Sequence, residues 1–156
     1  MGEAGRKILK IDIKWMLQQL NRAYADEWLA HYYMNWAANA IEGPNSKEIA
    51  EVLKEGSKQE LGHANRLAER ILELGGEPER DIEKLAKVSS GNPKFPKDSR
   101  DINGFLNAFI GMERGAIKFY NEIAEKTHGK DLVSHELFEE LLADEVGDEE
   151  EFENLL

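Results

Sequence analysis

Apolar positions recur along the chain at alternating spacings of three and four residues, which is the pattern of a helix with one buried face. Glycine and proline interrupt this pattern three times, and no stretch alternates with period two for long. The sequence therefore predicts an all-α protein. Its four long helices are expected at residues 10–42, 46–74, 101–128 and 131–155.

Three of these stretches begin after a residue that can accept hydrogen bonds from the free amides of a first helical turn. Asn45, with Glu48 three residues later, is expected to form a capping pair for the second helix. Asp101 and Asp131 are expected to cap the third and fourth helices. These signals agree with the division made by glycine and proline.

The connection between the second and third helices, residues 76–100, is long for a loop and contains five glycines or prolines. Twenty-five extended residues can span up to about 80 Å, which is enough to run the length of a bundle. The two short connections instead require antiparallel neighbours. We therefore predict an antiparallel four-helix bundle with one long crossover between helices two and three, a short helix near 79–88, and a single domain over 1–156.

Each predicted buried face is apolar except near its middle, where it carries acids. Unpaired buried carboxylates lose hydration worth several kcal/mol and repel one another, and no Lys or Arg stands at the core positions of these faces. Cations are the simplest compensation, and carboxylates with one imidazole favour two iron ions, or manganese as the alternative. The predicted ligands are Glu27, Glu60, His63, Glu113, Glu145 and Asp148.

The spacing of these residues favours one shared site. Glu60 and His63 are three residues apart and so project from one helix face, and Glu145 with Asp148 repeats that spacing. Glu27 and Glu113 come singly from the other two helices.

The charge of the chain also points to cations as partners. It carries 31 acids against 20 bases, for a net charge of -11, and ten of the acids but no base lie in residues 135–156. Nucleic acid is therefore an unlikely partner, although Arg6, Lys7, Lys10 and Lys14 form a weak basic patch in a nearly neutral remainder. The chain has no cysteine, no apolar run of 18 residues and no visible signal segment, so we expect a cytoplasmic protein without a membrane span.

The run from Glu55 to Leu72, with its Glu60-Leu-Gly-His63 motif, resembles the second helix of the ferritin-like superfamily. Ala-Asp-Glu27-Trp and Met-Glu113-Arg are similar to the helices of that family that carry a single Glu. The resemblance spans all four helices and is closest to bacterioferritins and Dps-like ferritins.

The resemblance implies a ferroxidase that oxidises Fe2+ with O2 or H2O2 at a di-iron site, for iron storage and protection from oxidative stress. Glu60 and Glu145 would bridge the two irons, and Glu27, His63 and Glu113 would be terminal ligands. The family usually has a second Glu-x-x-His on helix four, where this chain has Glu145-Val-Gly-Asp148. Asp148 is the expected ligand at that position. His31, one turn beyond Glu27, is the alternative donor of a nitrogen but is expected to be an ordinary, partly exposed histidine.

Two further expectations follow from the resemblance. No haem is expected, because Leu61 stands where bacterioferritins have a haem-binding Met. Only eight residues follow Asp148, too few for the fifth helix of 24-subunit ferritins, so a homo-oligomeric shell of 12 subunits is expected.

Two other functions remain open at this stage. One is a peroxide-reducing di-iron or di-manganese enzyme that stores no mineral, and the other is a helical binding protein without catalysis. His128 and His135 flank the turn between helices three and four. We expect them to be surface residues, with a secondary metal site as the alternative.

Overall fold

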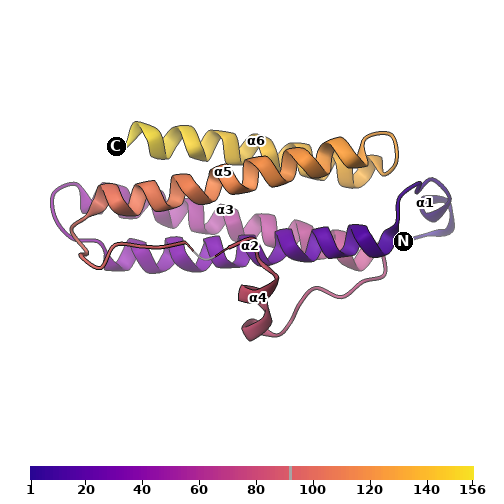
Figure 1. Ribbon diagram of the computed structural model, residues 1–156, viewed down its shortest axis with the longest axis horizontal. Coiled ribbons are helices and arrows are strands. Elements are labelled where there is room, and N and C mark those ends of the chain that lie inside the picture. Colours follow the sequence, from indigo (N-terminus) through magenta and orange to yellow (C-terminus); the bar gives the residue numbers. More distant parts are fainter. Residues whose placement is uncertain (92) are drawn as a thin grey trace.

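A computed structural model describes residues 1–91 and 93–156, and its four long helices lie side by side in a bundle (Figure 1). Their bounds lie within three residues of the predicted ones, and the described residues contain no strand, so the predicted all-α bundle is confirmed. No described helix combines the length and the apolar content that a membrane crossing needs. The long helices are α2 (Ile13–Ala40), α3 (Ser46–Glu73), α5 (Ile102–Thr127) and α6 (Leu132–Asn154).

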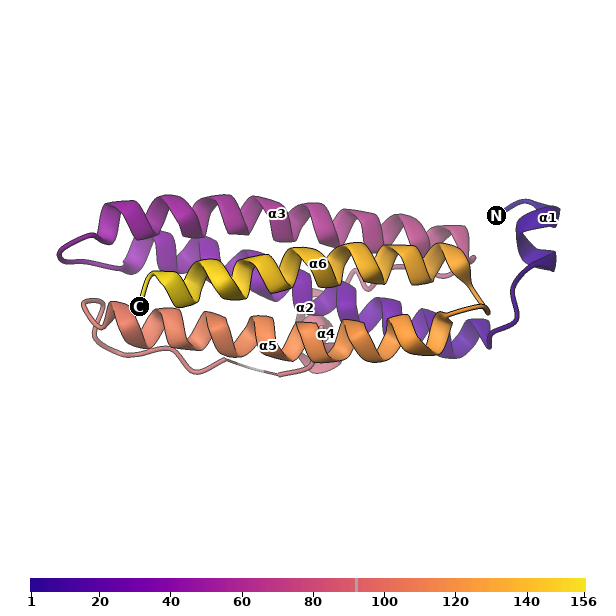
Figure 2. The same ribbon diagram turned by 90° about the horizontal axis from the view of Figure 1, so that it is seen from above.

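The four long helices form two antiparallel hairpins, α2 with α3 and α5 with α6 (Figures 1 and 2). The crossover between the hairpins runs along the bundle and returns the chain to the end where α3 began, so α3 and α5 run in parallel as predicted. It carries the expected short helix, α4 (Ile82–Val88). A second short helix, α1 (Glu3–Lys7), precedes the bundle and was not predicted.

Two of the three predicted helix caps are confirmed. The Oδ1 atom of Asp101 accepts a hydrogen bond from the Gly104 amide at 3.0 Å, and that of Asp131 accepts one from the Ser134 amide at 3.1 Å. The predicted side-chain cap by Asn45 is wrong, because Asn45 makes no such bond and has a left-handed backbone with φ of 63°. The tight turn after α2 uses the tolerance of asparagine for this conformation, whereas a capping residue is normally extended.

The apolar core consists of two clusters, one toward each end of the bundle. All four long helices contribute to both, with Met34, Leu53, Phe109 and Phe152 in one and Met16, Leu67, Tyr120 and Phe138 in the other. The acids of the predicted site fall between the two clusters in the sequence of each helix. This arrangement leaves a polar layer at mid-bundle, closed off from solvent by apolar side chains at both ends.

Candidate metal centre

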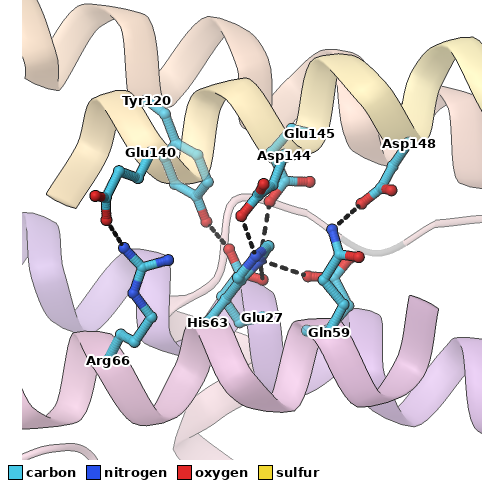
Figure 3. A network of polar contacts seen from close by, with 10 residues as sticks. Glu27, Gln59, His63, Arg66, Tyr120, Glu140, Asp144, Glu145 and Asp148 are labelled. Carbon is cyan, nitrogen blue, oxygen red and sulfur yellow. Dashed lines mark hydrogen bonds and ion pairs between the residues drawn. The ribbon is translucent and has the colours of Figure 1, made fainter. Parts of the chain in front are cut away.

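Four side chains meet in the polar layer at the middle of the bundle. Glu27 comes from α2, His63 from α3 and Glu145 from α6 (Figure 3). Glu60, the fourth residue, also belongs to α3. Each offers one ligand atom, these atoms all lie within 4.8 Å of one another, and no residue is more than 3% exposed. The sequence-based prediction that these four residues share a site therefore agrees with the fold.

The Nδ1 atom of His63 lies among the carboxylates. It is 3.4 Å from Oε2 of Glu27, 3.3 Å from Oε2 of Glu60 and 3.2 Å from Oε1 of Glu145. None of these contacts is aligned as a hydrogen bond, and Nδ1 has no hydrogen-bond partner among the described residues. Both oxygens of Glu60 and Oε1 of Glu145 lack partners as well. Since buried polar atoms are nearly always paired, this group calls for a ligand from outside the protein.

The other nitrogen of His63 points to an acid that sequence reasoning missed. Nε2 of His63 lies 3.2 Å from Oδ2 of Asp144, which is partly exposed. A carboxylate accepts a hydrogen bond, so this contact favours a proton on Nε2, and once the ring is neutral the Nδ1 lone pair faces the centre. Asp144 directly precedes Glu145, and adjacency to a predicted ligand was the only signal for it in the sequence.

Tyr120 also contacts the centre from α5. Its hydroxyl donates a hydrogen bond to Oε1 of Glu27, and the ring is fully buried (Figure 3). Tyr120 lies seven residues after Glu113 and so on the same helix face, but helical periodicity does not predict its hydrogen bond. The bond holds one oxygen of Glu27 and leaves the other free to face His63.

Glu113 brings a further carboxylate from α5. It is 2% exposed, and its Oε1 atom has no hydrogen-bond partner among the described residues. It does not belong to the group whose ligand atoms all lie within 4.8 Å, but after burial the charge of Glu145 contributes most to raising its pKa. Glu113 is therefore placed to extend the site beyond the four clustered residues.

The two alternative ligands weighed from the sequence both lie outside the four-residue cluster. Asp148 accepts a hydrogen bond from Nε2 of Gln59 at 2.7 Å (Figure 3). Nδ1 of His31 contacts the carbonyl of Ser57 at 2.7 Å and its hydroxyl at 2.9 Å. Both side chains are thus engaged by α3 rather than by the other acids.

Burial and mutual repulsion dominate the electrostatics of the centre. Burial raises the pKa of Glu60 well above its ordinary value, and the charges of Glu27 and Glu145 raise it further. Burial also raises the pKa of Glu113 and of Glu145, each with help from a neighbouring carboxylate. Without a metal ion, the centre therefore holds protons that a cation would have to displace.

The pKa values of the remaining groups at the centre reflect their close contacts with one another. Burial raises the pKa of Glu27, but its close contacts with Glu60 and His63 outweigh this and lower it overall. Burial lowers the pKa of His63, but its contacts with Glu145, Glu27 and Glu60 raise it overall. At the edge of the centre, burial and the charge of Glu145 raise the pKa of Asp148 to about 7.

A cavity of about 270 Å³ reaches the centre between α2, α5 and the crossover. Its lining includes Glu27, Glu113 and Tyr120 at the inner side and Asp26 with Ser90 of the crossover. Asp26 accepts hydrogen bonds from the amide and hydroxyl of Ser90, and burial raises its pKa to about 6. The cavity brings a small solute within reach of two buried carboxylates.

The donor set suits hard cations. It offers carboxylate oxygens from all four long helices and one imidazole nitrogen, and the chain has no thiol. Carboxylate-rich sites with a single imidazole bind iron or manganese in preference to softer metals. The unpaired oxygens and the unpaired nitrogen are the atoms that such an ion would contact.

Comparison with known proteins gives an independent line of evidence. The ferritin-like domain model matches residues 17–156. The chain is 31% identical to the DNA protection during starvation protein of Pyrococcus furiosus, with 100% of this chain and 86% of the relative covered. It is also 31% identical to a bacterioferritin of Desulfovibrio desulfuricans, with 90% of this chain and 73% of the relative covered.

Solved structures include similar folds. The dodecameric thioferritin of Bacteroides fragilis, a bacterioferritin-related protein, superimposes with a TM-score of 0.88 at 32% identity. That match covers 93% of this chain and 86% of the other. Because this chain has no cysteine, no thiol chemistry can be carried over from that relative.

Proposed function

Because this chain belongs to the ferritin-like domain family, we propose that it binds Fe2+ at the mid-bundle centre and oxidises it to Fe3+ with O2 or H2O2. The observation that carries the proposal is the group of buried ligand atoms without partners from Glu60, His63, Glu113 and Glu145. A centre built for structure alone would have its charges paired within the protein.

Each carboxylate has a distinct role in this proposal. Glu60 and Glu145 each lie close to other acids on both sides and would be shared between two Fe2+ ions. Glu27 and His63 would complete the site of one ion, and Glu113 that of the other. Two bound ions would let four electrons reach O2 in two cycles, giving four Fe3+ and two waters from four Fe2+, one O2 and four protons. With H2O2, two Fe2+ and two protons give two Fe3+ and two waters.

The charge of the ligand set favours release of the product. Four ionised glutamates with neutral His63 carry -4, which balances two Fe2+ ions, and oxidation leaves an excess of +2. Asp148, held nearby by Gln59, would offset part of that excess if it turned inward. The cavity beside Glu27 and Glu113 would admit Fe2+ and the oxidant.

Asp144 and Tyr120 would act as positioning residues. Asp144 orients the ring of His63 through Nε2, and Tyr120 fixes one oxygen of Glu27. Neither needs to touch iron, because each acts through the ligand that it holds.

We further propose that the chain assembles into a 12-subunit shell that stores the ferric product and so limits oxidative damage. The dodecameric state of the Bacteroides fragilis relative supports this assembly. The acidic C-terminal helix would attract Fe2+ to such a shell, because charge of one sign raises the local concentration of its counterion. The same net charge of -11 argues against DNA as a partner.

The test is iron oxidation by the purified protein, followed as ferric absorbance after mixing with Fe2+ and either O2 or H2O2. We expect oxidation well above the buffer background and a loss of about 100-fold or more in Glu60→Ala, because a shared ligand is removed. Glu69→Ala, which changes an exposed acid on the same helix, is the matched control and should oxidise iron normally. A wild-type rate equal to the buffer background would contradict the proposal.

Light scattering separates storage from a small redox enzyme. A particle near twelve times the 17.7 kDa of one chain supports the shell. A monomer or dimer that still reduces peroxide would instead favour the enzyme that stores no mineral, and manganese would then be the second metal to examine.

A further inference from the structure

Two of the four histidines of the chain face each other across the α5–α6 turn, at one end of the bundle (Figure 1). Nδ1 of His128 lies 3.2 Å from Nε2 of His135, and the ring centroids are 4.9 Å apart at 76°. His128 is the C-cap residue of α5, and His135 lies in the first turns of α6. The mid-bundle centre does not involve either residue.

The ring of His135 is oriented by the backbone of α5. Its Nδ1 atom lies 2.9 Å from the carbonyl oxygen of Ala124. A carbonyl can only accept a hydrogen bond, so Nδ1 carries the proton and a neutral ring keeps its lone pair on Nε2. A backbone carbonyl in this position is the usual partner of a metal-binding histidine, because it fixes both the tautomer and the ring direction.

A carboxylate faces the same nitrogen. Oε1 of Glu139, one turn further along α6, lies 3.5 Å from Nε2 of His135. The side chain of Glu139 is well exposed, and that of His135 is only partly so. Nε2 of His135 therefore faces both His128 and Glu139, although the ligand atoms of the three residues do not all lie within 4.8 Å of one another.

The spacing of these atoms suits a tetrahedral ion. Zinc binds histidine nitrogen at about 2.0–2.1 Å and carboxylate oxygen at about 2.0–2.2 Å, so neighbouring ligands in a tetrahedron are about 3.3–3.4 Å apart. The separations from Nε2 of His135 are 3.2 Å to His128 and 3.5 Å to Glu139, one just below and one just above this value. To seat an ion between all three residues, the exposed side chain of Glu139 would have to turn toward His128.

We propose that His128, His135 and Glu139 form a second metal site, which binds Zn2+ or a similar divalent transition-metal ion at the surface. Exposed His128 leaves the fourth position open to water or to another ligand. The donor set is richer in nitrogen than the mid-bundle centre, so it selects zinc-like ions where the buried carboxylates select iron or manganese. The site does not depend on the proposed oxidation of iron.

The first test is a Zn2+ titration in competition with a coloured chelator, on wild type and on single variants. His128→Gln and His135→Gln should each weaken one Zn2+ site per chain by about 100-fold, and Glu139→Gln by about 10-fold, as loss of a ligand predicts. His31→Gln, which removes a histidine bonded to Ser57 instead, should leave that site unchanged, and His63→Gln identifies any binding at the buried centre. Equal Zn2+ stoichiometry and affinity in wild type, His128→Gln and His135→Gln would overturn the proposal.

A second measurement uses the unmodified chain and so does not depend on the folding of a variant. Crystals exposed to Zn2+ should give anomalous scattering at the zinc edge between His128 and His135. Anomalous density confined to the mid-bundle centre would overturn the proposal.

Discussion

Two clusters of charged groups are buried in the bundle, and they differ in how completely their polar atoms are paired. In the first, Arg70 of α3 is 3% exposed and Asp131, at the start of α6, is 2% exposed. Nη2 of Arg70 donates to both oxygens of Asp131 at 2.8 and 3.0 Å, and its Nε donates to Oγ of Ser134 at 2.9 Å. Asp131 also accepts from the amide and the hydroxyl of Ser134.

The mid-bundle centre is equally buried but is not paired in this way. Both oxygens of Glu60 and one atom each of His63, Glu113 and Glu145 have no hydrogen-bond partner among the described residues. The comparison shows that burial of charge alone does not mark a functional site. Incomplete pairing does mark a functional site. A charged cluster whose polar atoms are all hydrogen-bonded within the protein stabilises the fold, whereas a cluster with unpaired polar atoms requires a ligand.

The largest effect is expected from Asp131→Asn, which breaks the complete cluster. The substitution keeps the size and an oxygen acceptor but leaves the buried Arg70 charge with the half-exposed Glu73 as its remaining carboxylate partner, so the free energy of unfolding should fall by about 3 kcal/mol. Chemical denaturation measures this loss. Arg66→Gln, which breaks the more exposed pair of Arg66 with Glu140 on the same two helices, is the control and should cost less than about 1 kcal/mol. Equal losses of unfolding free energy in Asp131→Asn and Arg66→Gln would contradict the conclusion that the fully paired, buried cluster stabilises the fold.

At the mid-bundle centre, where pairing is incomplete, we expect Glu60→Gln not to destabilise the fold. In metal-free protein it removes a carboxylate that its neighbours repel, so the free energy of unfolding should stay equal or rise. Mn2+ at about 100 times its Kd should stabilise wild type by about 3 kcal/mol and the variant far less. Thermal unfolding with chelator and with Mn2+ gives both comparisons. A marked loss of stability in the metal-free variant would show that Glu60 is structural.

Asp144→Asn should have a smaller effect, because Asp144 contacts His63 from outside the cluster. Loss of a carboxylate that orients a metal-binding histidine typically weakens metal binding by about 10 to 100-fold. Titration with Mn2+ measures this change, and stability without metal should hardly change since Asp144 is partly exposed. Glu136→Gln, on the exposed face of α6, is the control. Unchanged Mn2+ affinity would mean that the contact with His63 does not matter for binding.

The smallest predicted effect is on the pH dependence of stability without metal. Glu60, Glu113 and Glu145 have pKa values above the ordinary 4.5 in the folded state, so the folded chain holds protons that the unfolded chain has lost. Stability from these groups is complete below pH 4.5 and is lost as pH rises through their raised pKa values. His63, also raised, acts in the same direction above pH 6.5, whereas Glu27, which is lowered, acts against it.

We therefore expect the free energy of unfolding of metal-free wild type to fall relative to that of Glu60→Gln as pH rises, by at most about 1.4 kcal/mol per pH unit for one proton. Bound Mn2+ should reduce this slope because it replaces the protons. Denaturation of both proteins at several pH values measures the difference, and a difference independent of pH would contradict the raised pKa of Glu60.

Much of the fold and of the centre was accessible from the sequence because both depend on helical periodicity. The stripes of apolar residues predicted the four long helices, and an acid at the middle of each stripe predicted that Glu27, Glu60, His63 and Glu145 would meet. The role of these residues in binding metal stays a prediction. The same holds for Asp148, whose spacing from Glu145 predicts a ligand and whose side chain accepts a hydrogen bond from Gln59.

Other features depended on contacts between helices that periodicity does not encode. Leu67 and Ile71 follow the apolar spacing of α3, whereas Arg70 beside them is charged, so the spacing does not predict that it is buried. Its burial is possible because Asp131 and Ser134, distant in sequence, supply its partners. Asp144 was overlooked for a similar reason, since its role comes from the position of His63 on another helix.

The hairpin arrangement has a consequence for the kinetics of assembly. Glu27, Glu60 and His63 all belong to the α2–α3 hairpin, whereas Glu113 and Glu145 belong to the α5–α6 hairpin. Each hairpin is local in sequence and can form early, but the centre exists only after the two have docked across the long crossover. Docking brings the acids together, so it should be the late and slow event in refolding. Metal ions that offset their repulsion should therefore increase the refolding rate as well as slow unfolding.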